Sequence, residues 1–153
     1  MQVINNFLDN QEFFKIQQTI SGDTFPWFIK SPGVFFHDLY NKEKNQLSPF
    51  ISLIDSLNKK LEVSTLIDAQ ILMTIKTEKG QESEASNSLD IYDKTIKSIL
   101  FMNTSNAHID ISGLDKIECV ENRLLTLPAN MAHFGTTQTN KLHNIVLTIN
   151  YTL

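Results

Sequence analysis

The feature that most constrains the fold of this chain is a succession of short strand-like segments through its second half. Between residues 67 and 76 apolar and polar side chains alternate, and this period of two belongs to a half-buried β-strand and not to a helix. Short apolar segments separated by turn residues follow, and they predict further strands over residues 96–102, 107–111, 116–120, 123–127 and 144–151. Many short strands joined by turns are typical of an antiparallel sandwich or jelly roll.

Helical patterns are confined to the first part of the chain. Asp9 is a suitable N-cap for a short surface helix. Ser48 is a second N-cap, Pro49 suits the first helical position, and apolar residues three, four and seven positions apart continue to Leu61. This apolar stripe predicts that the second helix, over residues 48–61, packs against a sheet.

Size and composition predict one domain. The chain has 153 residues, of which 41% are hydrophobic and 20% charged, and such a chain can form a core without metals or disulfides. We expect a mainly β domain with a helical N-terminal part over residues 1–62 and a β core over residues 63–153. An aromatic, proline-marked segment at residues 25–29 predicts one early strand within the N-terminal part.

The charge distribution restricts the classes of partner. The net charge is -4, and the Lys and Arg residues are scattered among acids, so we expect no nucleic-acid partner. No segment approaches the roughly 20 apolar residues of a membrane span, and the N-terminus lacks the pattern of a secretion signal. The single cysteine, Cys119, suits a reducing compartment. We therefore expect a soluble, cytoplasmic protein whose partner is a small molecule or another protein.

His108 and Asp110 form the first candidate metal pair, because residues i and i+2 of a strand project from the same face. Together with His133 they would supply two histidines and one carboxylate. The short separation between His108 and His133 leaves room for about two strands, whereas a jelly-roll metal site takes its paired ligands from an early strand and its last histidine from a late one. Two unrelated surface side chains are therefore the favoured interpretation of His108 and Asp110.

Four short motifs follow one another in the last third of the chain: Asn103-Thr104, Asn122-Arg123-Leu124, the segment 127–137 around His133, and Ile149-Asn150-Tyr151. This order resembles a phage and marine-bacterial branch of the iron(II)/2-oxoglutarate oxygenases, similar to the prolyl-hydroxylase-like group. The resemblance covers most of residues 60–153. It implies a double-stranded β-helix, which is a jelly roll like that of the cupins.

The resemblance also implies positions for the metal ligands. His133 matches the distal metal histidine of the family. The triplet Ser88-Leu89-Asp90 is the best match to the family's His-x-Asp pair, with Asp90 as the carboxylate and Ser88 in place of the expected histidine. The arginine that binds the far carboxylate of 2-oxoglutarate corresponds to Asn144, with His143 beside it. Neither of these side chains supplies a guanidinium fork.

These two replacements decide the function that we expect. Loss of even an outer hydrogen-bond partner of a metal ligand costs about 10–100-fold in affinity or activity, and loss of the arginine costs roughly 10- to 150-fold in cosubstrate affinity. Iron(II) and 2-oxoglutarate, which the resemblance implies, should therefore bind poorly, and we expect a catalytically silent binding or scaffold protein. The alternative is an active non-haem iron oxygenase that uses Asp90, His133 and a third ligand from Glu84 or His108.

Three further side chains have two interpretations each. Cys119 shares the strand phase of Ile117 and is expected to be buried and unreactive rather than nucleophilic. His37 either covers the mouth of the barrel or is a structural histidine bonded to the backbone. Glu82 either lends a carboxylate to the site or belongs to a solvated acidic loop.

Overall fold

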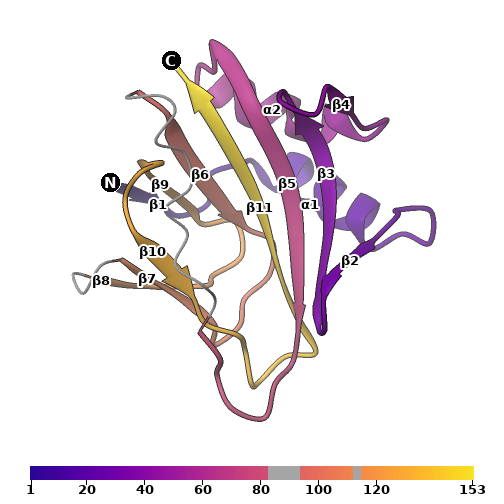
Figure 1. The fold of residues 1–153 in the computed structure, drawn as a ribbon, viewed down its shortest axis with the longest axis vertical. Helices are drawn as coiled ribbons and strands as arrows, with labels where there is room; N and C mark the ends of the chain where they lie inside the picture. Colours follow the sequence, from indigo (N-terminus) through magenta and orange to yellow (C-terminus); the bar gives the residue numbers. More distant parts are fainter. Residues whose placement is uncertain (83–93, 112–114) are drawn as a thin grey trace.

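The computed structural model describes residues 1–82, 94–111 and 115–153. Strands are the main secondary structure of the described chain, and Figure 1 shows them arranged around a common interior. The strands of the larger sheet are β1 (Gln2–Ile4), β2 (Phe28–Ser31), β3 (Val34–Asn41), β4 (Gln46–Leu47), β5 (Thr65–Ile75), β6 (Ile96–Phe101), β9 (Leu124–Pro128) and β11 (His143–Thr152). The strands of the smaller sheet are β7 (His108–Ile111), β8 (Asp115–Glu118) and β10 (His133–Gly135).

Both sheets are antiparallel. Within the described ranges the larger sheet has eight strands in the order β1-β9-β6-β11-β5-β3-β2, with β4 paired to β3, and the smaller sheet has the order β10-β7-β8. The strands predicted from residue 67 onwards are all present. The N-terminal part is less helical than expected, because β1 to β4 fall within residues 1–62 and pair with the larger sheet.

The first predicted helix is α1 (Asn10–Ile20). It begins where expected, because the Asp9 side chain accepts a hydrogen bond from the backbone N–H of Glu12. It is more than a surface helix, since Phe13, Ile16 and Ile20 are buried on one of its faces. No helix in the described ranges is both long enough and apolar enough to cross a lipid bilayer.

The second predicted helix is shorter than expected and has two parts. A 3-10 turn, η1 (Ile51–Ile54), leads into α2 (Asp55–Lys60), so a continuous helix from residue 48 to residue 61 is wrong. Ser48 still caps this segment, but the first backbone bonds after it, from Ile51 N–H to the Ser48 oxygen and from Leu53 N–H to the Phe50 oxygen, have the i to i+3 spacing of a 3-10 turn. The Ser48 hydroxyl accepts a hydrogen bond from the backbone N–H of Phe50, as an N-cap would, and it lies 2.7 Å from His37 Nε2, which ties this residue to β3.

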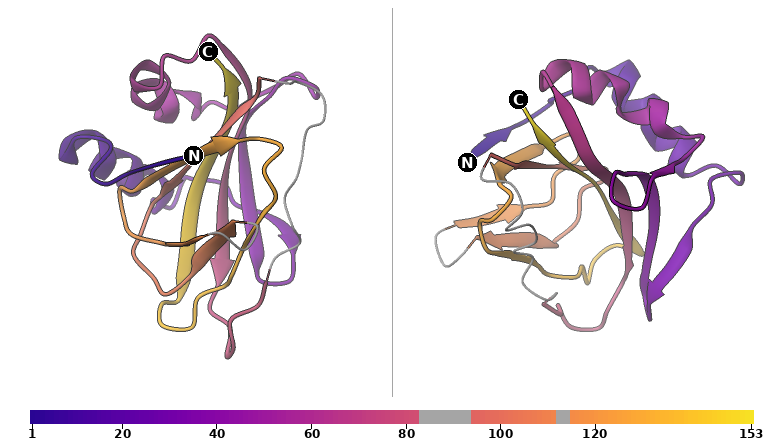
Figure 2. Two further views of the ribbon diagram at one scale, coloured as in Figure 1. Left: turned by 90° about the vertical axis from the view of Figure 1, so that its left-hand side faces the viewer. Right: turned by 45° about the horizontal axis from the view of Figure 1, so that its top comes forward.

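The larger sheet separates two layers of apolar side chains. The helices cover one of its faces, and the smaller sheet faces the other (Figure 2). On the helix side the core contains Leu57 of α2, Ile71 of β5 and Leu147 of β11, and on the other side a second cluster contains Phe101 and Ile111. The structure is thus a mainly β, two-sheet antiparallel barrel with helices outside one sheet, as predicted.

Strand β5 shows how this arrangement creates a polar interior. Its apolar residues Ile67, Ala69 and Ile71 are buried on the helix side. Its polar residues Asp68 and Gln70 therefore point to the opposite face, because successive side chains of a strand alternate. That face is only partly open to solvent, since the smaller sheet lies over it. The alternation predicted from the sequence is correct, and its polar side lines the inside of the barrel.

Candidate functional site

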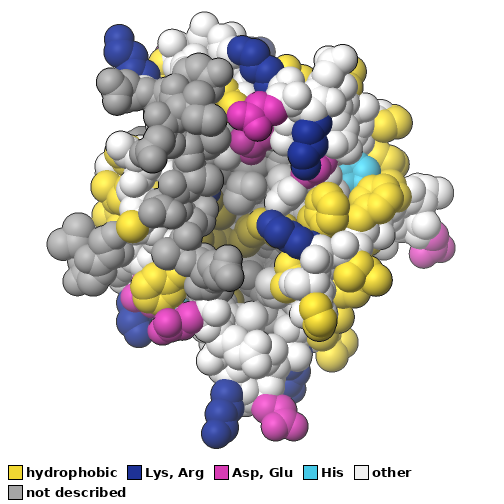
Figure 3. Space-filling model, viewed as in Figure 1, with side chains coloured by type: hydrophobic (Ala, Val, Ile, Leu, Met, Phe, Trp, Pro, Cys, Tyr) yellow, Lys and Arg dark blue, Asp and Glu magenta, His cyan; other side chains and the backbone are white. Residues whose placement is uncertain are grey.

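A cavity of about 440 Å³ lies between the two sheets. Figure 3 shows a hollow in this face of the molecule, with acidic and basic side chains around it. Its wall on the larger sheet includes Asp68, Lys97 and Asn150, and its wall on the smaller sheet includes Ile109 and His133. One wall of the cavity is thus largely polar, which is unusual for the interior of a small barrel.

The polar wall is built by the strand register. Asp68 of β5 lies opposite Asn150 of β11, and Asn150 lies opposite Lys97 of β6. Residues that are directly opposite on neighbouring strands share a face of the sheet, so these three side chains form one row across it. Asn150 Nδ2 donates a hydrogen bond of 2.8 Å to Asp68 Oδ1. Asn150 and Lys97 are each 6% exposed, and Asp68 is half-buried.

His133 approaches the cavity from the other sheet. It lies opposite Ile111 and is 5% exposed. Its Nδ1 is 2.8 Å from the backbone oxygen of Met131. A carbonyl oxygen can only accept, so we assign the ring proton to Nδ1, and Nε2 of the neutral imidazole then has a free lone pair. Metal-binding histidines usually have this arrangement, in which one nitrogen is held by an acceptor and the other binds the metal.

A cation already faces this lone pair. Lys97 Nζ lies 3.5 Å from His133 Nε2, and both side chains are buried. The ammonium group therefore stands in front of the nitrogen that a metal would use.

Burial controls the protonation of this cluster. Burial lowers the pKa of the Lys97 ammonium, and the nearby Asp68 carboxylate partly offsets that effect. Burial also lowers the pKa of His133, and the positive charge of Lys97 acts in the same direction. The pKa of Asp68 is raised by burial, against the hydrogen bond from Asn150. The imidazole is accordingly neutral near pH 7, which fits its role as an acceptor for Lys97.

The described residues alone do not assemble a complete site for a metal together with 2-oxoglutarate. In the described part of the chain, no three His, Cys, Asp or Glu side chains are close enough together to hold a metal ion. Asn144, in the position expected for the arginine, is buried: it accepts a hydrogen bond of 2.8 Å from Ser105, and its Nδ2 lies 3.9 Å from Cys119 Sγ. The neighbouring His143 is exposed.

Part of the predicted ligand set is not described. Ser88, Leu89 and Asp90 lie outside the described residues, as does Glu84. The assignment of Asp90 as a metal ligand, with Ser88 in place of a histidine, therefore stays a prediction.

The alternative pair, His108 and Asp110, lies on the other face of the smaller sheet. His133 is opposite Ile111, and the next residue, Phe134, is opposite Asp110, so His133 and Asp110 project to different faces. His108 Nε2 lies 3.0 Å from Asp110 Oδ2, which is the same-face contact expected from their spacing. The structure thus brings His108 and Asp110 together and separates both of them from His133.

His37 lies on the helix side of the larger sheet and not at the cavity. Its Nδ1 is 2.7 Å from the backbone oxygen of Pro26, its Nε2 is 2.7 Å from Ser48 Oγ, and its ring packs against Phe25. His37 is therefore a structural histidine. Glu82 is exposed, and its backbone pairs with that of Thr136.

Cys119 is 2% exposed, and burial raises the pKa of its thiol to about 12. An ordinary thiol has a pKa of about 8.5, so its reaction with an alkylating reagent levels off above that pH. In the folded protein the rate of alkylation should instead keep rising with pH beyond this point, because the reactive thiolate is still a minor species. Alkylation quenched at timed intervals and quantified by mass spectrometry measures this pH dependence, with the urea-unfolded chain as control. The prediction would be wrong if the alkylation rate of the folded protein levelled off at the same pH as that of the unfolded chain.

Lys97, Asp68 and Asn150 were not singled out as site residues from the sequence. Lys97 is in phase with the buried apolar residues Ile99 and Phe101 of β6, and a lysine at such a position is the one signal that could have revealed it. Asp68 looked like the solvent side of an amphipathic strand. Its role depends on the smaller sheet, which strand periodicity does not reveal.

Comparisons with known proteins agree with this architecture. No protein-family model matches the sequence, and no curated protein is significantly similar to it. Many solved structures are similar in fold, and three of them serve as examples. HygX from Streptomyces hygroscopicus, with nickel and 2-oxoglutarate bound, has a TM-score of 0.69 at 11% identity, covering 98% of this chain and 81% of that one.

The viral collagen prolyl hydroxylase of Paramecium bursaria Chlorella virus 1, as its 2-oxoglutarate complex, has a TM-score of 0.64 at 12% identity, covering 99% and 96% of the two chains. An oxidoreductase of the 2OG-Fe(II) oxygenase family from Burkholderia pseudomallei has a TM-score of 0.68 at 9% identity, covering 98% and 82%. Identities this low establish the fold alone. This chain therefore has the double-stranded β-helix fold of the 2-oxoglutarate and iron(II) oxygenases, as its sequence motifs predict.

Proposed function

We propose that this chain is a catalytically silent member of the oxygenase fold, which binds a small molecule in the cavity between its sheets. The observation that carries the proposal is the position of Lys97 Nζ, 3.5 Å from His133 Nε2. The lysine supplies the positive charge that a metal ion supplies in a working oxygenase.

Electrostatics support this proposal. A divalent ion on His133 Nε2 would lie within a few ångströms of the Lys97 ammonium. The repulsion would amount to several kcal/mol even at an effective dielectric constant of about 20. To admit the ion, Lys97 would have to lose its proton or withdraw, and its side chain is buried in the wall of the barrel.

The residue at the position expected for the cosubstrate arginine also supports this proposal. HygX and the viral hydroxylase are described with 2-oxoglutarate bound. In this chain Asn144 is held by Ser105 where a cationic fork is expected. Metal binding and cosubstrate binding are separate requirements: the position of Lys97 bears on the first, and that of Asn144 on the second. The cytoplasmic location and the identity of any protein partner stay predictions from the sequence.

The alternative function, an active oxygenase with an altered metal site, is favoured by one observation. His133 has the orientation of a metal ligand, with Nδ1 held by Met131 and Nε2 directed at the cavity. This function would use Asp90 as a second ligand and Glu84 or His108 as a third. His108 is on the wrong face for that role.

Anaerobic titration of the wild-type protein with iron(II) and 2-oxoglutarate tests the proposal. We expect no visible charge-transfer band between iron and the oxoacid, and no consumption of 2-oxoglutarate when oxygen is admitted. The variant His133→Ala, measured in parallel, should behave like the wild type. A band at micromolar iron that His133→Ala abolishes would instead establish the alternative function.

A further inference from the structure

Lys97, His133 and Met131 together have the parts of an activated nucleophile. Lys97 extends from the larger sheet and His133 from the smaller one, and Lys97 Nζ lies 3.5 Å from His133 Nε2 at the wall of one cavity. The backbone oxygen of Met131 holds the other ring nitrogen, Nδ1. A nucleophile, a base within reach of it and a third group that orients the base are the parts of a nucleophilic site. The contact can therefore do more than exclude a metal ion.

Burial makes the Lys97 amine more reactive than that of an ordinary lysine. An amine attacks a carbonyl carbon only when it is neutral, and with the usual lysine pKa of about 10.4 fewer than one side chain in about a thousand is neutral at pH 7. Lys97 is 6% exposed, and burial lowers its pKa, while the nearby Asp68 raises this pKa and Lys30 lowers it further. His133, whose own pKa is lowered, is neutral and can accept the proton that the ammonium must lose.

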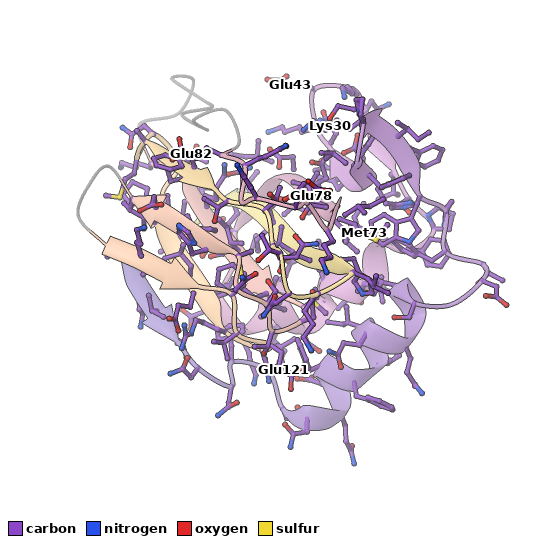
Figure 4. All side chains as sticks on the ribbon, turned by 90° about the horizontal axis from the view of Figure 1, so that it is seen from below. Lys30, Glu43, Met73, Glu78, Glu82 and Glu121 are labelled. Carbon is purple, nitrogen blue, oxygen red and sulfur yellow. The ribbon has the colours of Figure 1, made fainter. Side chains whose placement is uncertain are left out.

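The charges around the cavity favour an uncharged carbonyl compound. The charged side chains that the described residues place there are two lysines, Lys30 and Lys97, and three acids, Asp38, Glu43 and Asp68. Lys30 and Glu43 lie on the same side of the molecule in Figure 4, so the acid offsets that lysine. A carboxylate on the ligand would meet more like charges than opposite ones, and a cation beside the carbonyl group would face Lys97.

The size and the apolar lining of the cavity suit a small organic ligand. A volume of about 440 Å³ lies within the range of small-molecule sites, which is about 300–1,000 Å³. Ile99, Ile109 and Val146 line the cavity with apolar side chains, which can pack against the C–H groups of a ligand. A ligand that fills this space also displaces water, and fewer waters near the reacting carbon slow the hydrolysis of an imine.

We infer that Lys97 captures a small, uncharged aldehyde or ketone in the cavity as a reversible imine, with His133 as the proton acceptor. This inference rests on the proposed function and names the class of ligand for its cavity. Both side chains are available for this reaction because, in the proposed function, no metal ion occupies His133 Nε2.

The reaction is a condensation in which nothing is oxidised or reduced. The Lys97 ammonium gives one proton to His133 Nε2, and the freed lone pair of Nζ forms a bond to the carbonyl carbon while the carbonyl π electrons move to oxygen. A second proton then passes from nitrogen to that oxygen. The imidazolium returns its proton to the resulting hydroxyl, the C–O bond breaks, and water leaves as the C=N bond forms. The products are a protonated imine on Lys97, one water molecule and a neutral His133.

Reductive trapping on the wild-type protein tests the inference. The protein is incubated at pH 7 with benzaldehyde and cyanoborohydride, which reduces an imine to a stable secondary amine, and peptide mass spectrometry locates the label. We expect at least about tenfold more label on Lys97 than on Lys30, which lines the same cavity but is exposed. Near pH 10 this preference should shrink, because a large share of the exposed lysines is then neutral as well. Glyoxylate, an anionic aldehyde, should show a smaller preference for Lys97 over Lys30 than benzaldehyde does.

The role of His133 is tested by the rate of labelling. His133→Ala removes the proton acceptor and keeps the amine, so labelling of Lys97 at pH 7 should slow about tenfold or more, while long incubation still labels it. Lys116→Met is the matched control, because Lys116 is an exposed lysine on β8 that does not line this cavity. It should leave the labelling rate of Lys97 within about twofold of the wild type.

Three results would overturn the inference: no more label on Lys97 than on Lys30 at pH 7, a rate that His133→Ala leaves unchanged, or an equal preference with glyoxylate. Failure of this inference is distinguishable from failure of the proposed function. Absence of label on Lys97 together with no iron-dependent band would remove the ligand class and leave a silent protein. An iron-dependent band that requires His133 would remove the proposed function, and with it this inference.

Discussion

Replacing Lys97 with methionine should tighten binding of a divalent metal by about a hundredfold or more, although the substitution adds no ligand. Methionine keeps the length of the side chain and removes the charge that faces His133 Nε2 at 3.5 Å. The freed imidazole already has the tautomer of a metal ligand, because its Nδ1 is held by Met131. Competition between the protein and a fluorescent indicator for cobalt(II), at fixed pH, measures the change.

Two controls separate this effect from a general change in charge. Lys30 also lines the cavity but is exposed, and Lys30→Met should alter cobalt affinity by no more than about twofold. The double variant Lys97→Met, His133→Ala should lose the gain entirely. If wild-type protein and Lys97→Met bind cobalt equally, Lys97 does not block the site, and the case for a silent protein loses its main support.

The substitution Asn122→Ala should lower the free energy of unfolding by about 3 kcal/mol. Asn122 is 4% exposed, and its side chain holds the backbone of Leu8 at both ends: Oδ1 accepts from Leu8 N–H at 2.9 Å, and Nδ2 donates to the Leu8 oxygen at 2.8 Å. Its φ of 57° lies in the left-handed region, which alanine adopts at a cost of about 1–2 kcal/mol. Equilibrium urea denaturation measures the loss.

Glycine separates the two contributions at this position. Asn122→Gly also loses both side-chain hydrogen bonds but adopts a positive φ without a Cβ clash, so it should be less destabilising than Asn122→Ala by about 1 kcal/mol. Asn45 has a φ of 49° and an exposed side chain, so Asn45→Ala should show the conformational cost alone. An Asn122→Ala variant as stable as Asn45→Ala would show that the contacts to Leu8 contribute little.

Asn122 also shows what a family motif can encode. The Asn122-Arg123-Leu124 motif is part of the resemblance to the oxygenases, yet its contacts are structural. Arg123 Nε donates to Asn5 Oδ1, Asn122 fixes Leu8, and Leu124 is buried in the core. The motif thus attaches the N-terminal segment to the barrel, which is a role separate from metal or cosubstrate binding.

The elements that were predicted correctly are those that a short segment of sequence is enough to indicate. The strands after residue 67 follow from the alternation of side chains, and α1 follows from the Asp9 cap and an apolar stripe. The order of motifs predicted the double-stranded β-helix. Strands without a local signal were missed. Strand β3 has a register shift between Asp38 and Tyr40 that breaks its alternation, and β10 has three residues and depends on its pairing with β7.

The sequence by itself determined most of the strands, the double-stranded β-helix fold and the start of α1 at Asp9, because each follows from one short segment or from the order of motifs. The match of Ser88 and Asn144 to ligand positions of the family stays a prediction. Only the tertiary structure decided what stands in front of His133. Lys97 belongs to the larger sheet and His133 to the smaller one, and their contact depends on how the two sheets face each other. Such a contact has no periodicity or spacing along the chain. A lysine in phase with buried apolar residues therefore became informative only once the positions of both sheets were known.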